Sequence, residues 1–222
     1  MADLEACYGA ENMTPSAIRM ITVAPELGAT ASVVASLASR GIVVAVGHSN
    51  ATYEEMVAAV QQGATMITHL FNAISTLNHR APGILGVLGA QHLARPYYGI
   101  IADNVHVHPA MVGVAYRAHP DGLILVSDAL CVLGMPDGEY QWNGKVVVKS
   151  GVKATLKDGG TIAGGCILPH SPILYLCTFL TRTAVCRCSN ASSTSSTGPG
   201  RPSLPPFGRS RRRRRRCWGY RR

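Results

Sequence analysis

Cysteine is scarce over residues 1–165 of this 222-residue chain, where only Cys7 and Cys131 occur. Two widely separated cysteines do not make a disulfide framework, which favours a reducing compartment. The first residues, MADLEACYGAEN, lack a basic stretch followed by an apolar one, so no secretory signal peptide is predicted. No apolar run reaches the roughly 18 residues that a membrane span needs. The sequence therefore predicts a cytoplasmic protein without a membrane segment.

Acidic residues and lysine are absent from residues 166–222, which contain 12 arginines. The formal net charge of +9 arises there, because residues 1–165 carry 9 basic and 12 acidic side chains, a net charge of −3. The same segment has a Ser/Thr run, a Pro-rich stretch, six consecutive arginines and no usable period. We therefore expect one globular domain over 1–165 and a disordered, low-complexity tail over 166–222.

Short apolar segments alternate with segments of helical spacing across the first part of the globular domain. The apolar segments are continuous, as expected for strands covered on both faces. They span residues 18–24, 42–46, 65–70, 97–102 and 123–127, with helices predicted over 32–40, 53–62 and 109–118 and a short one near 83–89. This alternation predicts right-handed crossovers and a parallel α/β sheet. The period alone does not distinguish a doubly wound sheet from a closed barrel.

The pattern changes after Asp128. Residues 139–142, 145–149 and 152–156 are short enough and suitably spaced to form antiparallel strands. Asn143-Gly144 and Ser150-Gly151 are the turns expected between them.

Metal-competent side chains stand where successive predicted parallel strands end. His48 and His69 end two of them, Asp103 and His106 follow a third, and Asp128 ends the last. Active sites of barrels and open α/β sheets lie at the carboxyl ends of their strands. A lone histidine after a strand is more often structural, so the residues by themselves leave a structural reading open. His92 and His119 fall outside this pattern and are predicted to be surface residues.

The two strand-end histidines have a spacing that suits one divalent ion. Neighbouring strand ends are about 5 Å apart, so His48 and His69 could share a cation at nitrogen–metal distances of roughly 2.1 Å. Such a cation activates a water, and Asp128 could take the proton of that water and pass it to the leaving group. A site of this kind performs hydrolysis without a nucleophilic serine or cysteine.

Six ordered motifs carry a resemblance to a known family. They are residues 21–26 (ITVAPE), 47–52 (GHSNAT), 68–73 (THLFNA), 79–83 (HRAPG), 99–106 (GIIADNVH) and 126–129 (VSDA). In this order and spacing the chain resembles the N-acetylglucosamine-6-phosphate deacetylases of the amidohydrolase superfamily, over roughly residues 2–165. The resemblance implies a metal-dependent (β/α)8 TIM barrel, of which this chain has the later part.

The resemblance also implies the roles of individual residues. His48 and His69 would bind the catalytic divalent metal ion, zinc or similar, and Asp128 would be the general base and then the general acid. On the substrate side, the family's pattern implies that His106 contacts the sugar and that the loop at Asn72 and Ala73 holds the substrate.

Arg80 resembles the arginine that reaches the substrate phosphate across the family's dimer interface, a role that suits a guanidinium fork. An ordinary loop arginine is the other reading of this residue. The implied reaction removes the acetyl group from N-acetylglucosamine 6-phosphate, so the implied partners are this phosphorylated amino sugar and a second copy of the chain.

The sequence departs from the family's pattern at both ends. The early strands and the Glu-Gly-Pro motif with the metal-binding glutamate are not found, and Glu26 is expected to anchor a strand end instead. The pattern stops at Gly164-Gly165-Cys166, where the family has a Ser-containing motif, which suggests a truncated or shifted coding sequence. We therefore expect this polypeptide alone to be inactive or nearly so.

Three alternatives stay open at this point. The chain could be another amidohydrolase that acts on a cyclic amide, or a non-catalytic truncated relic that pairs with a complete relative. The arginine run at 211–216, with Trp218 and Tyr220, could bind nucleic acid. Nucleic-acid binding is disfavoured, because no basic or aromatic surface is evident elsewhere in the sequence.

Overall fold

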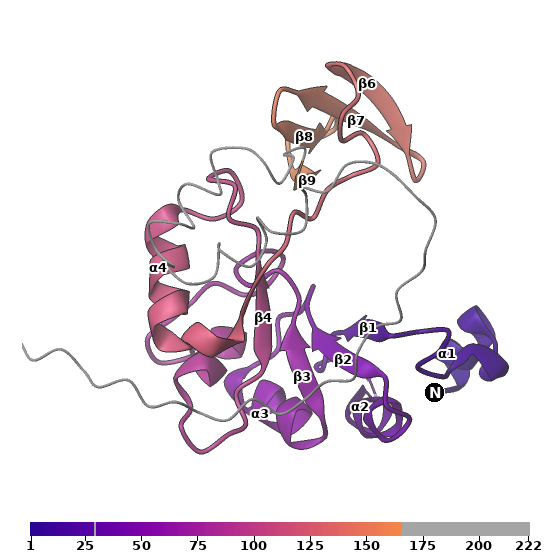
Figure 1. Cartoon of the computed structure of the whole chain (residues 1–222), viewed down its shortest axis with the longest axis vertical. Coiled ribbons are helices and arrows are strands. Elements are labelled where there is room, and N and C mark those ends of the chain that lie inside the picture. The colour runs from indigo at the N-terminus through magenta and orange to yellow at the C-terminus, as the bar shows by residue number, and fades with distance from the viewer. Residues whose placement is uncertain (29, 166–222) are drawn as a thin grey trace, which may run out of the picture. The chain divides into compact units, whose positions relative to one another are not determined.

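The computed structural model describes residues 1–28 and 30–165 (Figure 1). The predicted tail over 166–222, with its arginine run, lies outside the described residues. Within the described part there are a five-stranded sheet and a four-stranded sheet. No helix of this part is long and apolar enough to cross a membrane.

The five-stranded sheet is parallel, and its strands lie side by side in chain order. They are β1 (Met20–Val23), β2 (Val43–Val46), β3 (Ala64–Ile67), β4 (Tyr97–Ile100) and β5 (Leu123–Leu125). A doubly wound sheet reverses its strand order at one point, whereas the order of these strands does not reverse. The predicted α/β class and parallel sheet are confirmed, with each strand shorter than its apolar run.

Helices connect these strands at nearly the predicted places. They are α2 (Thr30–Ser39), α3 (Tyr53–Gln61), the 3-10 helix η2 (Gly83–Gly89), α4 (Pro109–Ala118) and the 3-10 helix η3 (Pro120–Gly122). Helix α3 begins with a full capping box, in which Thr52 accepts from the Glu55 amide and the Glu55 side chain accepts from the Thr52 amide. The N-terminal helices α1 (Ala2–Tyr8) and η1 (Ala10–Asn12) were not predicted.

One continuous hydrophobic core joins these helices to the sheet. It contains buried residues of all three long helices and of the inner strands, among them Val34, Leu37, Met56, Ala59, Val112, Ala115, Val44, Val46, Ile67 and Ile100. Strands β2 and β4 are buried after their first residue, whereas β1 and β5 at the sheet edges are more exposed. The core therefore fixes the strand ends of β2, β3 and β4, which carry the candidate site.

Tyr98 fastens the end of α4 to β4. Its buried hydroxyl lies 3.0 Å from the Ala115 carbonyl and 2.9 Å from the His119 carbonyl, and it can donate to either. Burial, with a smaller contribution from Tyr116, raises the pKa of Tyr98 to about 12. The phenol is therefore a permanent donor at neutral pH.

The four-stranded sheet is antiparallel, with its strands in chain order. They are β6 (Gly138–Trp142), β7 (Lys145–Ser150), β8 (Lys153–Leu156) and β9 (Ile162–Gly165). The first three were predicted and β9 was not. Asn143 and Gly144 both have positive φ, 46° and 74°, as a tight two-residue hairpin requires. Lys149, which is buried, pairs with Asp137 at 2.9 Å.

Candidate active site

His48 and His69 follow β2 and β3, and their rings meet. The two Nε2 atoms are 3.0 Å apart, and the rings contact edge to face with centroids 4.8 Å apart. His69 is buried and His48 is exposed. Two ligands of a tetrahedral zinc ion are about 3.4 Å apart when each bond is about 2.1 Å. A small opening of this pair would therefore admit a cation between the two nitrogens.

The second ring nitrogen of His69 has its own partner. Nδ1 lies 3.1 Å from the Asn72 carbonyl oxygen, which can only accept, so Nδ1 carries the proton in that hydrogen bond. The lone pair of His69 then sits on Nε2 and faces His48. Metal-binding histidines are held in this way by a neighbouring carbonyl or carboxylate. The donor set fits a divalent ion, although no three His, Cys, Asp or Glu side chains converge within the residues described.

A glycine lets the strands under these histidines approach closely. The Thr22 and Thr68 hydroxyls are 2.9 Å apart, and they join β1 to the residue before His69 across β2. Gly47 lies between them, where an added Cβ would stand 2.6 Å from the Thr68 Cβ. His48 directly follows this glycine, so its position depends on that close packing.

Glu26 binds the loop that carries His48. Its carboxylate accepts from the Ser49 hydroxyl and from the Asn50 amide, each at 2.6 Å. Burial tends to raise the pKa of Glu26, but the hydrogen bonds from Ser49 and Asn50 outweigh it and the pKa is lowered. The expectation that Glu26 anchors a strand end is confirmed. Sequence reasoning missed Ser49 as its partner.

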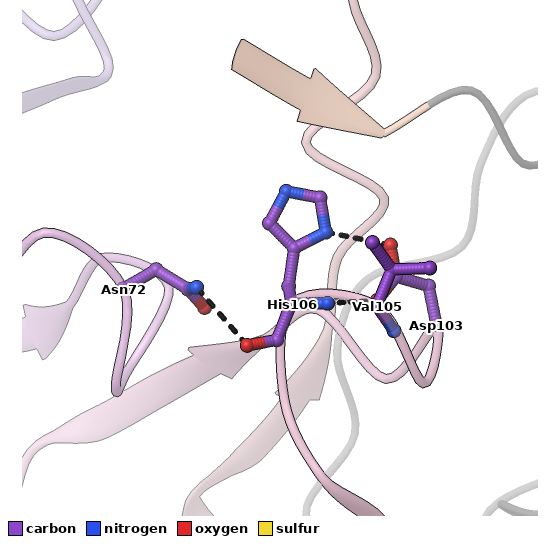
Figure 2. A network of polar contacts seen from close by, with 4 residues as sticks. All are labelled: Asn72, Asp103, Val105 and His106. Atoms are coloured by element: carbon purple, nitrogen blue, oxygen red, sulfur yellow. Dashed lines mark hydrogen bonds and ion pairs between the residues drawn. The ribbon is translucent and has the colours of Figure 1, made fainter. Parts of the chain in front are cut away.

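Asp103 and His106 form a buried pair after β4 (Figure 2). Asp103 Oδ2 lies 2.6 Å from His106 Nδ1, while Oδ1 accepts from the amides of Val105 and His106 at 2.9 and 2.7 Å. The side chains of this pair are only 5% and 6% exposed. In Figure 2 the second nitrogen of the His106 ring points away from Asp103, so it is available to another group. The Asp-x-x-His spacing in the sequence was a usable signal for this pair.

Asn72 connects the His69 loop to His106. Its side-chain nitrogen lies 3.4 Å from the His106 carbonyl oxygen, as Figure 2 shows. Its Oδ1 is buried and has no hydrogen-bond partner within the described residues. The next residue, Ala73, has a positive φ of 50°, and its carbonyl accepts from the Ser49 amide at 3.0 Å. Asn72 and Ala73 therefore lie between the histidine pair and His106, with one buried acceptor unused.

Within the described residues, the side chains of Asp128 and Arg80 make no hydrogen bond or ion pair with this group. Asp128 follows β5 with a φ of 45°, and its backbone carbonyl accepts from the Gly165 amide at 2.8 Å. In the part of the chain that the structure describes, its exposed carboxylate makes no hydrogen bond, and neither does the exposed Arg80 guanidinium. The catalytic role of Asp128 and the phosphate-binding role of Arg80 stay predictions.

The remaining histidines divide between surface and interior. His92 is exposed, as predicted. The prediction that His119 is a surface residue is wrong, because its ring is partly buried against Gly122 and its Nδ1 has no partner among the described residues. Burial and then the charge of Arg95 lower the pKa of His119. His108 accepts from the Ala110 amide and begins α4.

Known proteins match most of this chain, although no protein-family model does. It is 44% identical over 168 residues to the N-acetylglucosamine-6-phosphate deacetylase of Danio rerio, which is 74% of this chain and 40% of that protein. The deacetylase of Homo sapiens is 42% identical over 165 residues, 73% of this chain and 39% of that protein. The chain is homologous to the N-acetylglucosamine-6-phosphate deacetylases.

A solved deacetylase structure agrees with the sequence comparison. It is a variant of the Mycobacterium smegmatis enzyme in complex with N-acetyl-D-glucosamine-6-phosphate, with a TM-score of 0.68 and 32% identity, and the match covers 74% of this chain and 42% of that one. The resemblance predicted from the six motifs is confirmed. The chain spans about two fifths of the length of the curated deacetylases it matches.

Proposed function

We propose that this chain carries part of the active site of a metal-dependent amide hydrolase that removes the acetyl group from N-acetylglucosamine 6-phosphate. The observation that carries this proposal is the 3.0 Å approach of His48 Nε2 and His69 Nε2. The Asn72 carbonyl beside His69 Nδ1 supports it, since that contact directs the remaining lone pair toward His48. Homology with the deacetylases supplies the substrate class.

The fold that suits this function is a (β/α)8 barrel, of which β1 to β5 would be consecutive strands. Two features support it: the strand order never reverses, and the similarity to the solved deacetylase extends over most of the chain. In such a barrel the carboxyl ends of the strands surround one site. His48, His69, His106 and Asp128 all follow strands at those ends.

His48 and His69 would hold a divalent ion, zinc or similar. When bound, such an ion lowers the pKa of a coordinated water and polarises the amide carbonyl. Asp128 would take a proton from the attacking water and deliver it to the amide nitrogen as acetate leaves. Its exposed carboxylate has no hydrogen-bond partner in the described residues, so it is available for this transfer.

The substrate would be held by residues that still have unused polar atoms. His106 is fixed by Asp103 and has a second ring nitrogen for a sugar hydroxyl. Asn72 offers its buried Oδ1, and Ala73 belongs to the same loop. Arg80, exposed on its loop, would bind the phosphate of a substrate held by a second copy of the chain.

Metal binding by the whole chain is the first test of this proposal. Calorimetric titration with Zn²⁺ should give one ion per chain in the wild type and none in His69→Ala. His92→Ala is the matched control, because His92 is exposed and outside the site. If the wild-type chain bound no zinc, the proposed metal site would be refuted.

Sugar recognition needs a separate test, because the chain alone is expected to turn over poorly. The zinc-loaded chain should bind N-acetylglucosamine 6-phosphate more tightly than unphosphorylated N-acetylglucosamine, and Arg80→Ala should reduce that preference. Acetate release should be measured on the same samples. Zinc and sugar binding without any acetate release would favour the non-catalytic relic, and preferential binding of a cyclic amide would favour the other amidohydrolase.

A further inference from the structure

We propose that Glu26 is a positioning residue, whose carboxylate holds the loop after β2 so that His48 Nε2 meets His69 Nε2. This inference rests on the proposed function, because the two imidazoles are metal ligands only under that proposal. Glu26 follows β1 and has no place among the predicted ligands. Its contacts nevertheless lead directly to one of them.

Both carboxylate oxygens of Glu26 are engaged by the residues that follow His48. Oε2 accepts from the Ser49 hydroxyl and Oε1 accepts from the Asn50 amide, each at 2.6 Å. These are charge-assisted hydrogen bonds, which are shorter and stronger than bonds between neutral groups. Ser49 is only 2% exposed, so water competes poorly for its hydroxyl. The loop is therefore bound to the end of β1 immediately beside His48.

The opposite side of the same loop is bound to the His69 segment. The Ser49 amide donates to the Ala73 carbonyl at 3.0 Å, and Ser49 forms an isolated parallel bridge with Ile74. The Ser49 hydroxyl also accepts from the Ala51 amide at 3.1 Å. Ser49 is therefore fixed from both sides, by Glu26 from β1 and by Ala73 from the loop after β3.

This fixation matters because His48 and His69 have unfavourable backbone conformations. Their φ values are 49° and 27°, in the left-handed region that L-residues other than glycine avoid. Such conformations persist only where the surroundings over-determine them. Glu26 supplies two of the hydrogen bonds that do so for His48. Without them the loop can relax toward ordinary φ values, and the His48 ring then leaves His69.

Substitution of Glu26 in the full chain, followed by Zn²⁺ titration, tests this inference. Outer-shell groups that orient metal ligands typically change metal affinity by about 10- to 100-fold. Glu26→Ala should weaken zinc binding by a factor in that range, and Glu26→Gln, which keeps the shape but loses the charge, should weaken it less. Glu54→Ala is the control, because Glu54 is an exposed carboxylate at the start of α3.

A second measurement distinguishes positioning from a general loss of folding. Ring contacts between His48 and His69 in the metal-free chain can be followed by NMR, under conditions where circular dichroism shows each variant folded. Wild type and Glu54→Ala should show the contact, and Glu26→Ala should lose it. If Glu26→Ala does not fold, Glu26→Gln and Ser49→Ala replace it, and each should show a weakened contact.

The two measurements separate this inference from the proposed function. Equal zinc affinity and an unchanged ring contact in Glu26→Ala would overturn the role of Glu26 and leave the metal site standing. A wild type that binds no zinc would overturn the metal site, and the ring contact would still decide whether Glu26 positions His48. Retention of that contact in folded Glu26→Ala overturns the inference in either case.

Discussion

Two imidazoles of the candidate site have one nitrogen committed to a neighbour. His69 Nδ1 lies against the Asn72 carbonyl, and His106 Nδ1 lies against the Asp103 carboxylate. In each case the other nitrogen, Nε2, is left to face a ligand. The carboxylate of Asp103 costs more free energy to bury than a carbonyl does, unless its hydrogen bonds are satisfied.

Loss of the Asp103 charge should therefore destabilise the chain. Asp103→Asn places an amide against His106 Nδ1 where a carboxylate accepted before. Hydrogen bonds to charged groups contribute about 1.5–3 kcal/mol, and we expect the free energy of unfolding in urea to fall by roughly that amount. Asp158→Asn, at an exposed position, is the control. Identical urea midpoints for the two variants would show that the pair does not stabilise the fold.

The stabilisation that Glu26 contributes through its hydrogen bonds should depend on pH. Its pKa is lowered from the ordinary value of 4.5, so above 4.5 the carboxylate is charged in both the folded and unfolded chain and its stabilisation is complete. As the pH falls below 4.5, the unfolded chain takes up the proton first, and the stabilisation disappears through the folded pKa. The difference in unfolding free energy between wild type and Glu26→Gln should therefore shrink below pH 4.5. A difference that grows on acidification would contradict this sign.

At the scale of elements, the approach of β1 and β3 across Gly47 can be tested by one methyl group. Gly47→Ala places a Cβ 2.6 Å from the Thr68 Cβ and 3.2 Å from the Thr22 Cγ2. Overpacking of this kind costs about 1–3 kcal/mol. We expect the free energy of unfolding in urea to fall by that amount and zinc binding to weaken. Gly89→Ala is the control, since a Cβ there meets no atom within 4 Å. If folded Gly47→Ala bound zinc with normal affinity, the packing of β1 and β3 would not control the metal site.

The elements that could be predicted from sequence are those with a local signal. Helix α4 has the predicted bounds, because Pro109 suits a first helical turn, and β2, β3 and β4 are continuous apolar runs. Helix α1 was missed because none of its residues is buried, so it has no apolar stripe. Strand β9 was missed because its second half is two glycines, and it exists through its pairing with β8.

In the candidate site, too, only the features with a local sequence signal were predictable. The strand-end position of His48 and His69 was enough to predict that they meet. The Glu26–Ser49 hydrogen bond was not predictable, because it depends on how two loops turn after their strands. Chain alternation also left the choice between a doubly wound sheet and a barrel open, since strand order is a property of the folded sheet.

At the scale of the whole molecule, the described residues form two hydrophobic clusters. One belongs to the parallel sheet and its helices, and the other is built on Val132, Val147 and Ala154 with the antiparallel sheet. The domain boundary at residue 165 stays a prediction, because the residues that follow it lie outside the described part of the chain.

A chain that ends after Gly165 tests that boundary. If residues 1–165 are the folding unit, its free energy of unfolding in urea should equal that of the full chain within the error of the measurement. Its far-ultraviolet circular dichroism should keep the signal of the mixed α/β fold. A drop well beyond that error would move the boundary past residue 165.

Among the described residues, left-handed backbone at non-glycine positions is concentrated in the loops that follow the carboxyl ends of the parallel strands. Apart from Asn143 in its hairpin, these residues are His48, His69, Phe71, Ala73, Asn104 and Asp128. Each such conformation costs on the order of 1 kcal/mol or more, which glycine would not incur. His48→Gly should therefore resist urea better than His48→Ala, although both lack the imidazole. Selection for thermal resistance alone would therefore replace these strand-end residues before residues elsewhere in the sheet.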